Sequence, residues 1–114
     1  MSDTKDWVLE LVDIMAKLRA PDGCPWDQKQ THSTLKPYLI EESCEVLDAI
    51  DSGDMDHLQE ELGDVLMNLV FHAQLASEQN SFSFQDVARS ISEKMVHRHP
   101  HVFADSSCMS AEEV

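Results

Sequence analysis

Four acidic side chains are spaced so that they could together hold a metal ion. Glu42 and Glu45 precede Gly53, and Glu61 and Asp64 follow it. Glu45 and Glu61 are each eight residues from this glycine, and Glu42 and Asp64 are each eleven. If two antiparallel helices meet at Gly53, the pairs come level about 12 Å and about 16 Å from the turn. Carboxylates this close repel one another, and a hard divalent cation removes that repulsion.

Glu42 is notable because it falls on the side of its helix that is predicted to face the core. The apolar positions on that side recur at helical spacing: Leu35, Leu39, Val46 and Ala49. An ionised glutamate on a buried face is costly unless it is paired or bound to a cation. Taken singly, each acid could belong to an ordinary surface cluster, but four acids at matching levels favour a metal site.

The ligand types indicate which metal the site would hold. An all-oxygen set is typical of Mg²⁺, for which Mn²⁺ can substitute, whereas zinc prefers His or Cys at such positions. The Glu-x-x-His pairs of di-iron bundles are not found here. Glu41 is a candidate for orienting a ligand or accepting a proton from water, or else an exposed acid. Gly63 within a helix indicates a close approach to its backbone or a helix-packing contact.

The elements that would position these acids form an all-α fold, which we predict to be a four-helix bundle with a central antiparallel hairpin. We expect residues 1–114 to form one domain, with residues 103–114 as a tail. The first helix is predicted over residues 4–19, followed by a loop over residues 20–27. The hairpin helices run from residue 33 or 34 to 52, with Pro37 in the first turn, and from a cap at Asp54 to about residue 79. A fourth helix is predicted to start at Ser83 and stop before Pro100.

Composition limits the classes of partner. The formal charge is −14, from 22 acidic residues against eight Lys and Arg, so the chain is not expected to bind a nucleic acid polymer. A phosphate substrate would have to bring metal cations with it. Neither a signal peptide nor a membrane span is visible, so we expect a cytoplasmic protein without a membrane partner. The three cysteines are odd in number and widely spaced, which favours reduced thiols.

Few side chains are suited to contact a nucleotide. Lys94 and Arg98 are four residues apart, so they share a helix face and could reach phosphate oxygens, although a purely solubilising role is an alternative. Trp26 could stack on a base or ribose, or plug the end of the bundle. Tyr38 is a further candidate for the nucleotide pocket. His97, His99 and His101 resemble a metal tract, but Pro100 is expected to scatter them, which favours capping or packing.

The acidic motifs occur in a recognisable context. Glu41-Glu42-Ser43-Cys44-Glu45 and Glu61-Leu62-Gly63-Asp64 match the EExxE and ExxD signature of the MazG family of the all-α NTP pyrophosphatase superfamily. The surrounding segments also resemble that family, in order: Cys24-Pro25-Trp26-Asp27, Gln30-Thr31-His32, Pro37-Tyr38-Leu39 and Arg98-His99-Pro100-His101-Val102-Phe103. Many family members carry two such domains in tandem, so this sequence is a single-domain member or part of a longer protein.

The resemblance implies magnesium-dependent hydrolysis of nucleoside or deoxynucleoside triphosphates to the monophosphate and pyrophosphate, which would serve to clean the nucleotide pool. It also implies that Glu42, Glu45, Glu61 and Asp64 are the metal ligands. The alternative is a non-catalytic regulatory module that binds a nucleotide or alarmone around a structural metal. These two functions differ in whether pyrophosphate is released.

The sequence also predicts self-association. A second apolar stripe on the first hairpin helix points away from the core, and another is predicted on the second: Ile40, Cys44 and Leu47, then Met67, Val70 and Phe71. A domain of this size cannot cover both sides of its central hairpin. We therefore predict a homodimer or a dimer of dimers, with the hairpin helices near the interface.

Overall fold

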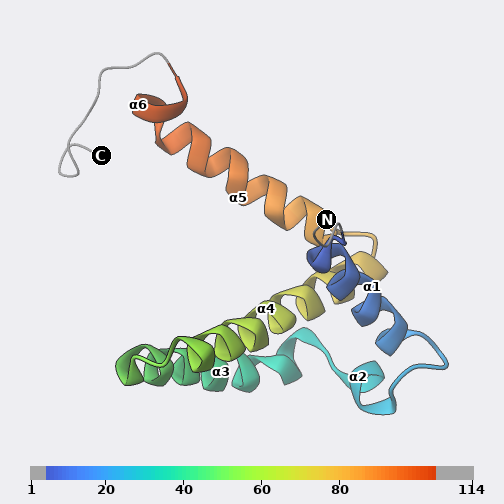
Figure 1. Cartoon of the computed structure of the whole chain (residues 1–114). Coiled ribbons are helices and arrows are strands. Elements are labelled where there is room, and N and C mark those ends of the chain that lie inside the picture. The colour runs from blue at the N-terminus through green and yellow to red at the C-terminus, as the bar shows by residue number, and fades with distance from the viewer. Residues whose placement is uncertain (1–4, 105–114) are drawn as a thin grey trace.

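The computed structural model describes residues 5–104, in which every regular element is a helix (Figure 1). The all-α fold class predicted from the sequence is therefore confirmed. The elements follow one another along the chain as α1 Trp7–Arg19, α2 Pro25–Lys29, α3 His32–Ser52, α4 Met55–Glu78, α5 Phe84–Arg98 and α6 Pro100–Phe103. Within the described residues, no helix combines the length and apolar content needed to cross a bilayer.

The α3–α4 hairpin forms where the sequence predicted it, because its ends are well capped. Thr31 and Thr34 form a capping box at the start of α3. Gly53 ends α3 with φ of 74°, in the left-handed region that glycine adopts without a Cβ penalty. The Asp54 side chain then accepts hydrogen bonds from two amides of the first turn of α4. Because α3 begins at residue 32, Pro37 lies in its second turn rather than its first.

Helix α4 is the central element, and α1 and α3 pack against it. The buried core cluster joins Met15 of α1 and Leu35 of α3 to three α4 residues, Val70, Phe71 and Leu75. The prediction that Val70 and Phe71 face away from the core was wrong, since they are only 1% and 2% exposed. The C-terminal half of α4 is apolar on several sides, and α1 and α3 cover two of these sides. The helical period alone could not show which sides are covered.

Three short stretches differ from the prediction. The Asp6 side chain accepts hydrogen bonds from Val8 and Leu9, so α1 begins at residue 7 rather than 4. The predicted loop over residues 20–27 contains the start of α2, which has Pro25 at its first position and is too short to show periodicity. Residues 100–103 form α6, so residue 103 ends a helix rather than beginning a tail. The rest of the predicted tail lies outside the described residues.

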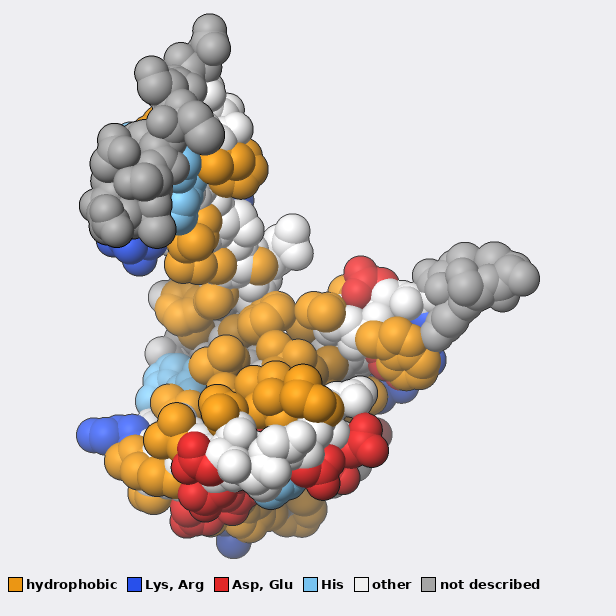
Figure 2. Space-filling view, turned by 60° about the vertical axis from the view of Figure 1, so that its left-hand side comes forward, with side chains coloured by type: hydrophobic (Ala, Val, Ile, Leu, Met, Phe, Trp, Pro, Cys, Tyr) orange, Lys and Arg blue, Asp and Glu red, His pale blue; other side chains and the backbone are white. Residues whose placement is uncertain are grey.

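Helix α5 ends before Pro100 as predicted, but it does not lie alongside the hairpin. It leaves the end of α4 at a wide angle (Figure 1), and none of its residues is buried. The radius of gyration is 17.7 Å, whereas a compact chain of this length would have about 13 Å. Figure 2 shows hydrophobic side chains on both arms of the resulting angle. Helix α5, which the sequence predicted as the fourth helix of the bundle, thus has no buried residue within one chain.

Candidate metal and nucleotide site

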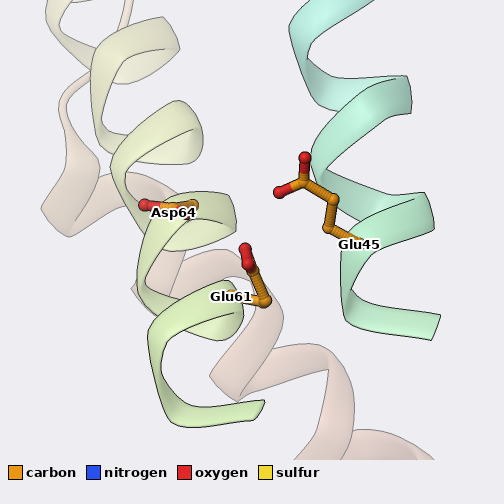
Figure 3. Close-up of side chains that lie close together, drawn as sticks. All are labelled: Glu45, Glu61 and Asp64. Carbon is orange, nitrogen blue, oxygen red and sulfur yellow. The ribbon is translucent and has the colours of Figure 1, made fainter. Parts of the chain in front are cut away.

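Three of the predicted acids converge in the α3–α4 hairpin. Glu45 projects from α3 toward Glu61 and Asp64 of α4 (Figure 3). One carboxylate oxygen of each residue lies within 4.8 Å of the others. Glu61 is only 9% exposed, while Glu45 and Asp64 are exposed to solvent. The antiparallel register about Gly53 thus brings these side chains together, although their role as ligands remains a prediction.

Glu42 lies at the edge of this group rather than in it. Burial raises the pKa of the Glu42 carboxyl, and the charges of Asp64, Glu45 and Glu41 raise it further, while the Asn68 side chain partly offsets the rise. The Oε1 atom of Glu42 is buried without a hydrogen-bond partner. The core-facing position predicted for Glu42 is confirmed by its half-buried state. A carboxylate in this position is suited to a cation as its partner.

Glu61 experiences the same excess of negative charge. Burial raises its pKa, as do a hydrogen bond and charge from Glu45 and the charge of Asp64. His57 lowers it, with Nε2 3.7 Å from a Glu61 oxygen. The other oxygen of Glu61, Oε1, is buried and accepts no hydrogen bond. Buried carboxylate oxygens without donors are suited to a hard divalent cation, so the residues present fit Mg²⁺.

Asn68 is a polar residue of the site that sequence reasoning overlooked. It lies on α4 one turn beyond Asp64, is 2% exposed, and has an Oδ1 atom without a hydrogen-bond partner. A hydrogen bond from its side chain partly offsets the raised pKa of the Glu42 carboxyl. The sequence signal was its spacing of seven from Glu61 and four from Asp64, which places all three near one helix face. The apolar residues around Asn68 obscured that signal.

The two predicted phosphate contacts are not brought to the carboxylates within one chain. Lys94 and Arg98 are exposed on α5, which diverges from the hairpin (Figure 1). Lys94 instead borders a hollow of about 460 Å³, together with Phe82, Asp86, Val87, Ser90 and Ile91. Glu41 is exposed on α3, and its charge contributes to the raised pKa of Glu42.

The two predicted aromatic contacts lie together at the end of the hairpin away from Gly53. The rings of Trp26 and Tyr38 meet edge to face with centroids 5.8 Å apart, and Trp26 also contacts Phe71 at 6.5 Å. Trp26 is 49% exposed and Tyr38 is 42% exposed. Tyr38 precedes Glu42 by one helical turn. Trp26 therefore covers one edge of the core, and about half of its surface stays exposed.

The histidines near the end of α5 have a local structural role. The Nδ1 atom of His99 lies 2.6 Å from the Met95 carbonyl oxygen, and the rings of His99 and His101 are tilted against each other at 5.4 Å. His99 is also the residue at which α5 ends and α6 begins. These contacts agree with capping and packing of the helix junction.

Comparison with known proteins places this geometry in a family. The MazG nucleotide pyrophosphohydrolase domain matches residues 30–103. The nucleoside triphosphate pyrophosphohydrolase/pyrophosphatase MazG of Thermotoga maritima is 60% identical over 97 residues, which are 85% of this chain and 38% of that protein. The nucleoside triphosphate pyrophosphohydrolase of Escherichia coli K12 is 53% identical over 105 residues, which are 91% of this chain and 40% of that protein.

The uncharacterized protein YabN of Bacillus subtilis is 58% identical over 92 residues, which are 81% of this chain and 19% of that protein. The chain thus spans two fifths or less of the length of these three relatives. The match covers both acidic motifs and the whole α3–α4 hairpin that carries them. This chain belongs to the MazG family.

Proposed function

We propose that this domain hydrolyses nucleoside and deoxynucleoside triphosphates to the monophosphate and pyrophosphate, with Mg²⁺ as cofactor. The observation that carries the proposal is the group formed by Glu45, Glu61 and Asp64, whose oxygens lie within 4.8 Å of one another. The buried oxygens of Glu42 and Glu61 that accept no hydrogen bond support it further. Two of the relatives are named nucleoside triphosphate pyrophosphohydrolases, which fits the same reaction.

The proposed ligands are Glu42, Glu45, Glu61 and Asp64. When bound, Mg²⁺ or Mn²⁺ supplies positive charge against the phosphate oxygens and lowers the pKa of a coordinated water. Hydrolysis of the anhydride between the α- and β-phosphates consumes one water and releases a proton beside the site. Glu41 is exposed next to Glu42 and is the proposed acceptor of this proton.

The nucleoside is proposed to lie toward the exposed faces of Trp26 and Tyr38. Both residues stand beyond Glu42 on the side away from Gly53, so a substrate whose phosphates meet the acids would extend toward them. The ring faces can stack on a base or ribose. Lys94 and Arg98 would contribute charge to the phosphates from a second protomer, because α5 leads away from the acids of its own chain.

The homodimer is proposed from surface that one chain leaves uncovered. Ile40 and Leu47 on α3 are 68% and 60% exposed, and Ile91 on α5 is also exposed. Hydrophobic side chains line both arms of the angle between α5 and the hairpin (Figure 2). An isolated soluble domain rarely exposes so much contiguous apolar surface. A second copy placed in that angle would cover it and bring α5 of one protomer toward the acids of the other.

A product assay tests the proposed reaction. A panel of ribo- and deoxyribonucleoside triphosphates is incubated with Mg²⁺ or Mn²⁺, and monophosphate, pyrophosphate and orthophosphate are quantified. We expect equal amounts of monophosphate and pyrophosphate, and a loss of activity in Glu42→Gln and Asp64→Asn. Glu60→Gln, which neutralises an exposed acid outside the group, should retain activity. Orthophosphate and a nucleoside diphosphate as products would overturn the proposed reaction. Tight nucleotide binding without turnover would favour the regulatory alternative.

A further inference from the structure

Arg19, the last residue of α1, is the polar centre of a junction between α1, α2 and α4. Its Nη1 atom donates hydrogen bonds to three carbonyl oxygens at the end of α2, those of Asp27 at 2.7 Å, Gln28 at 2.9 Å and Gln30 at 3.2 Å. Its Nε and Nη2 atoms donate to the Glu78 carboxylate of α4 at 3.0 and 2.5 Å. The Arg19 side chain is 12% exposed. One guanidinium therefore ties α2 to α4.

Helix α2 depends on this junction because it contributes no buried side chain to the core. It spans five residues and buries none of them, and a helix this short is not stable by itself. The Asp27 carbonyl accepts the backbone amide of Gln30, and the last carbonyls of the helix carry the negative end of its dipole. Arg19 satisfies several of these carbonyls with a positive charge. Gln28 adds a hydrogen bond from Nε2 to the Ala20 carbonyl oxygen at 2.5 Å.

The residue that α2 presents is Trp26. Its ring meets Tyr38 edge to face at 5.8 Å and rests against Phe71 at 6.5 Å, while about half of its surface stays exposed. Helix α2 buries no side chain, yet it holds a large and half-exposed aromatic against Tyr38, which lies one helical turn before Glu42. The position of that aromatic depends on α2, and the position of α2 depends on Arg19.

The contacts also require an arginine rather than any cation. A guanidinium offers five donors in a fixed planar fork, so it can serve the Glu78 carboxylate and the α2 carbonyls together. A lysine ammonium has three donors on one flexible point. Lysine at position 19 could keep the ion pair with Glu78 but could not also hold the end of α2.

We propose that Arg19 is a positioning residue for nucleoside recognition, which it performs by fixing α2 so that the exposed face of Trp26 stands beside Tyr38 to receive the base or ribose of the substrate. This inference rests on the proposed function, and it assigns the nucleoside end of the substrate to the α2 aromatic. The phosphate end depends on Glu42, Glu45, Glu61 and Asp64, whereas the acid that Arg19 holds on α4 is Glu78.

The test separates the two ends of the substrate. In Arg19→Lys, KM for a nucleoside triphosphate should rise about tenfold with kcat nearly unchanged, which is the scale of one lost stacking contact. Inorganic tripolyphosphate, which lacks a nucleoside, should inhibit Arg19→Lys and the unmodified protein with the same inhibition constant. Trp26→Leu should raise KM similarly, and the double variant should add little. Arg89→Lys, at an exposed ion pair on α5, is the matched control and should behave as the unmodified protein.

A binding measurement keeps the test independent of turnover. In a Trp7→Phe background Trp26 is the remaining tryptophan, so nucleotide binding in the presence of Mg²⁺ should quench its fluorescence, and Arg19→Lys should weaken the quench. Should Arg19→Lys fail to fold, Glu78→Gln, which releases the other side of the guanidinium, should give a smaller rise in KM. The inference is overturned if hydrolysis proceeds while Trp26→Leu leaves KM unchanged. It is also overturned if Arg19→Lys weakens the binding of tripolyphosphate as much as the binding of nucleotide. Quenching without hydrolysis would sink the proposed reaction and leave the role of Arg19 standing.

Discussion

The buried carboxylate oxygens of Glu42 and Glu61 govern how the site behaves before any ligand arrives. Both carboxyls have a pKa above the usual range, because burial and neighbouring acids disfavour the ionised form. A raised pKa in the folded state means that ionisation costs stability. The cost is present above the folded pKa and disappears as pH falls through it. A proton, a cation or a neutral side chain can each remove it.

Neutralising Glu42 is therefore predicted to raise the stability of the protein and to lower its activity. In EDTA at pH 7.5, Glu42→Gln should raise the unfolding temperature by about a few degrees, because it removes one of the repelling charges around Asp64 and Glu45. The gain should shrink as pH is lowered toward 4.5, the ordinary value for a glutamate, because the raised pKa of Glu42 lets it take up a proton before that pH is reached. The same variant should lose at least about 100-fold in kcat/KM. Thermal unfolding and activity measured side by side check both; a lower unfolding temperature at pH 7.5 would contradict the electrostatic reading.

Metal binding is predicted to stabilise the protein through the same group. At Mg²⁺ a hundredfold above its dissociation constant, binding should add about 2.7 kcal/mol to the free energy of unfolding. Asp64→Asn should reduce this gain, because it removes the negative charge of one of the three converging carboxylates. Titration of Mg²⁺ during chemical denaturation measures the effect, with Glu60→Gln as the matched control. An equal gain in Asp64→Asn and the unmodified protein would place the cation elsewhere.

Single residues also show where sequence reasoning succeeds and where it fails. Glu42 was found because an acid within an apolar stripe breaks the helical pattern. Gly63 indicated a close approach to its backbone or a helix-packing contact, yet a Cβ there would meet nothing within 4 Å among the described residues. The sequence predicted no close contact at Gly23, although a Cβ there would lie 2.3 Å from the Leu18 carbonyl oxygen. A glycine's spatial need depends on a neighbour that the local sequence does not reveal.

At the scale of elements, the turn between α1 and α2 depends on the missing side chain of Gly23. Its amide donates to the Ala20 carbonyl, and the next amide donates to that of Leu18, which draws the backbone against the end of α1. Gly23→Ala should cost about 1–3 kcal/mol of stability, as local backbone strain does. Gly63→Ala, in an exposed helical position, should be neutral or gain up to about 1 kcal/mol. Urea denaturation compares the two, and equal stabilities would mean that the α1–α2 turn relaxes freely.

The start of α3 is joined to the C-terminal half of α4 by two histidines. The Nδ1 atoms of His32 and His72 are 2.7 Å apart in nearly parallel rings, with centroids at 5.0 Å. This separation is too short for van der Waals contact, so one ring donates an N–H to the other. Such a bond holds one proton between the two nitrogens and cannot form when both rings are fully protonated.

Acid should therefore weaken this connection. Burial, and then the charge of His32, lowers the pKa of His72. A lowered folded pKa means that the folded state resists protonation, so stability should fall as pH drops below the unfolded value of about 6.5. His72→Gln should flatten the decline in unfolding free energy between pH 7 and 5.5, whereas His97→Gln, on exposed α5, should not. An unchanged slope in His72→Gln would show that the decline has another source.

Element boundaries were predictable where capping residues mark them and uncertain elsewhere. Thr31, Gly53 and Asp54 fix the hairpin ends, and Ser83 fixes the start of α5. Helix α2 was missed because five residues show no period. The direction of α5 could not be predicted, because an amphipathic stripe does not say whether its partner is the same chain or a second copy.

The whole molecule is more extended than its length requires, with an apolar surface on each arm of an open angle. Ile91 lies on the α5 arm and is about half exposed. Ile91→Glu should shift a dimer or dimer of dimers toward the monomer in sedimentation velocity, because it would bury a charge without a partner. Ser92→Glu places the same charge beside it as the control. A monomeric unmodified protein at micromolar concentration would rule out the dimer.

Complementation decides whether the dimer also completes the site. Asp64→Asn and Lys94→Ala are each expected to be inactive, the first for lack of a metal ligand and the second for lack of a phosphate contact. If Lys94 serves the acids of the other protomer, a mixed dimer contains one site in which both residues are intact. Random exchange makes half of the dimers mixed, so the mixture should recover about a quarter of the unmodified activity. Should the mixed dimers form without recovery, Lys94 acts on its own chain, and the carboxylates must bind the triphosphate without help from the partner's α5.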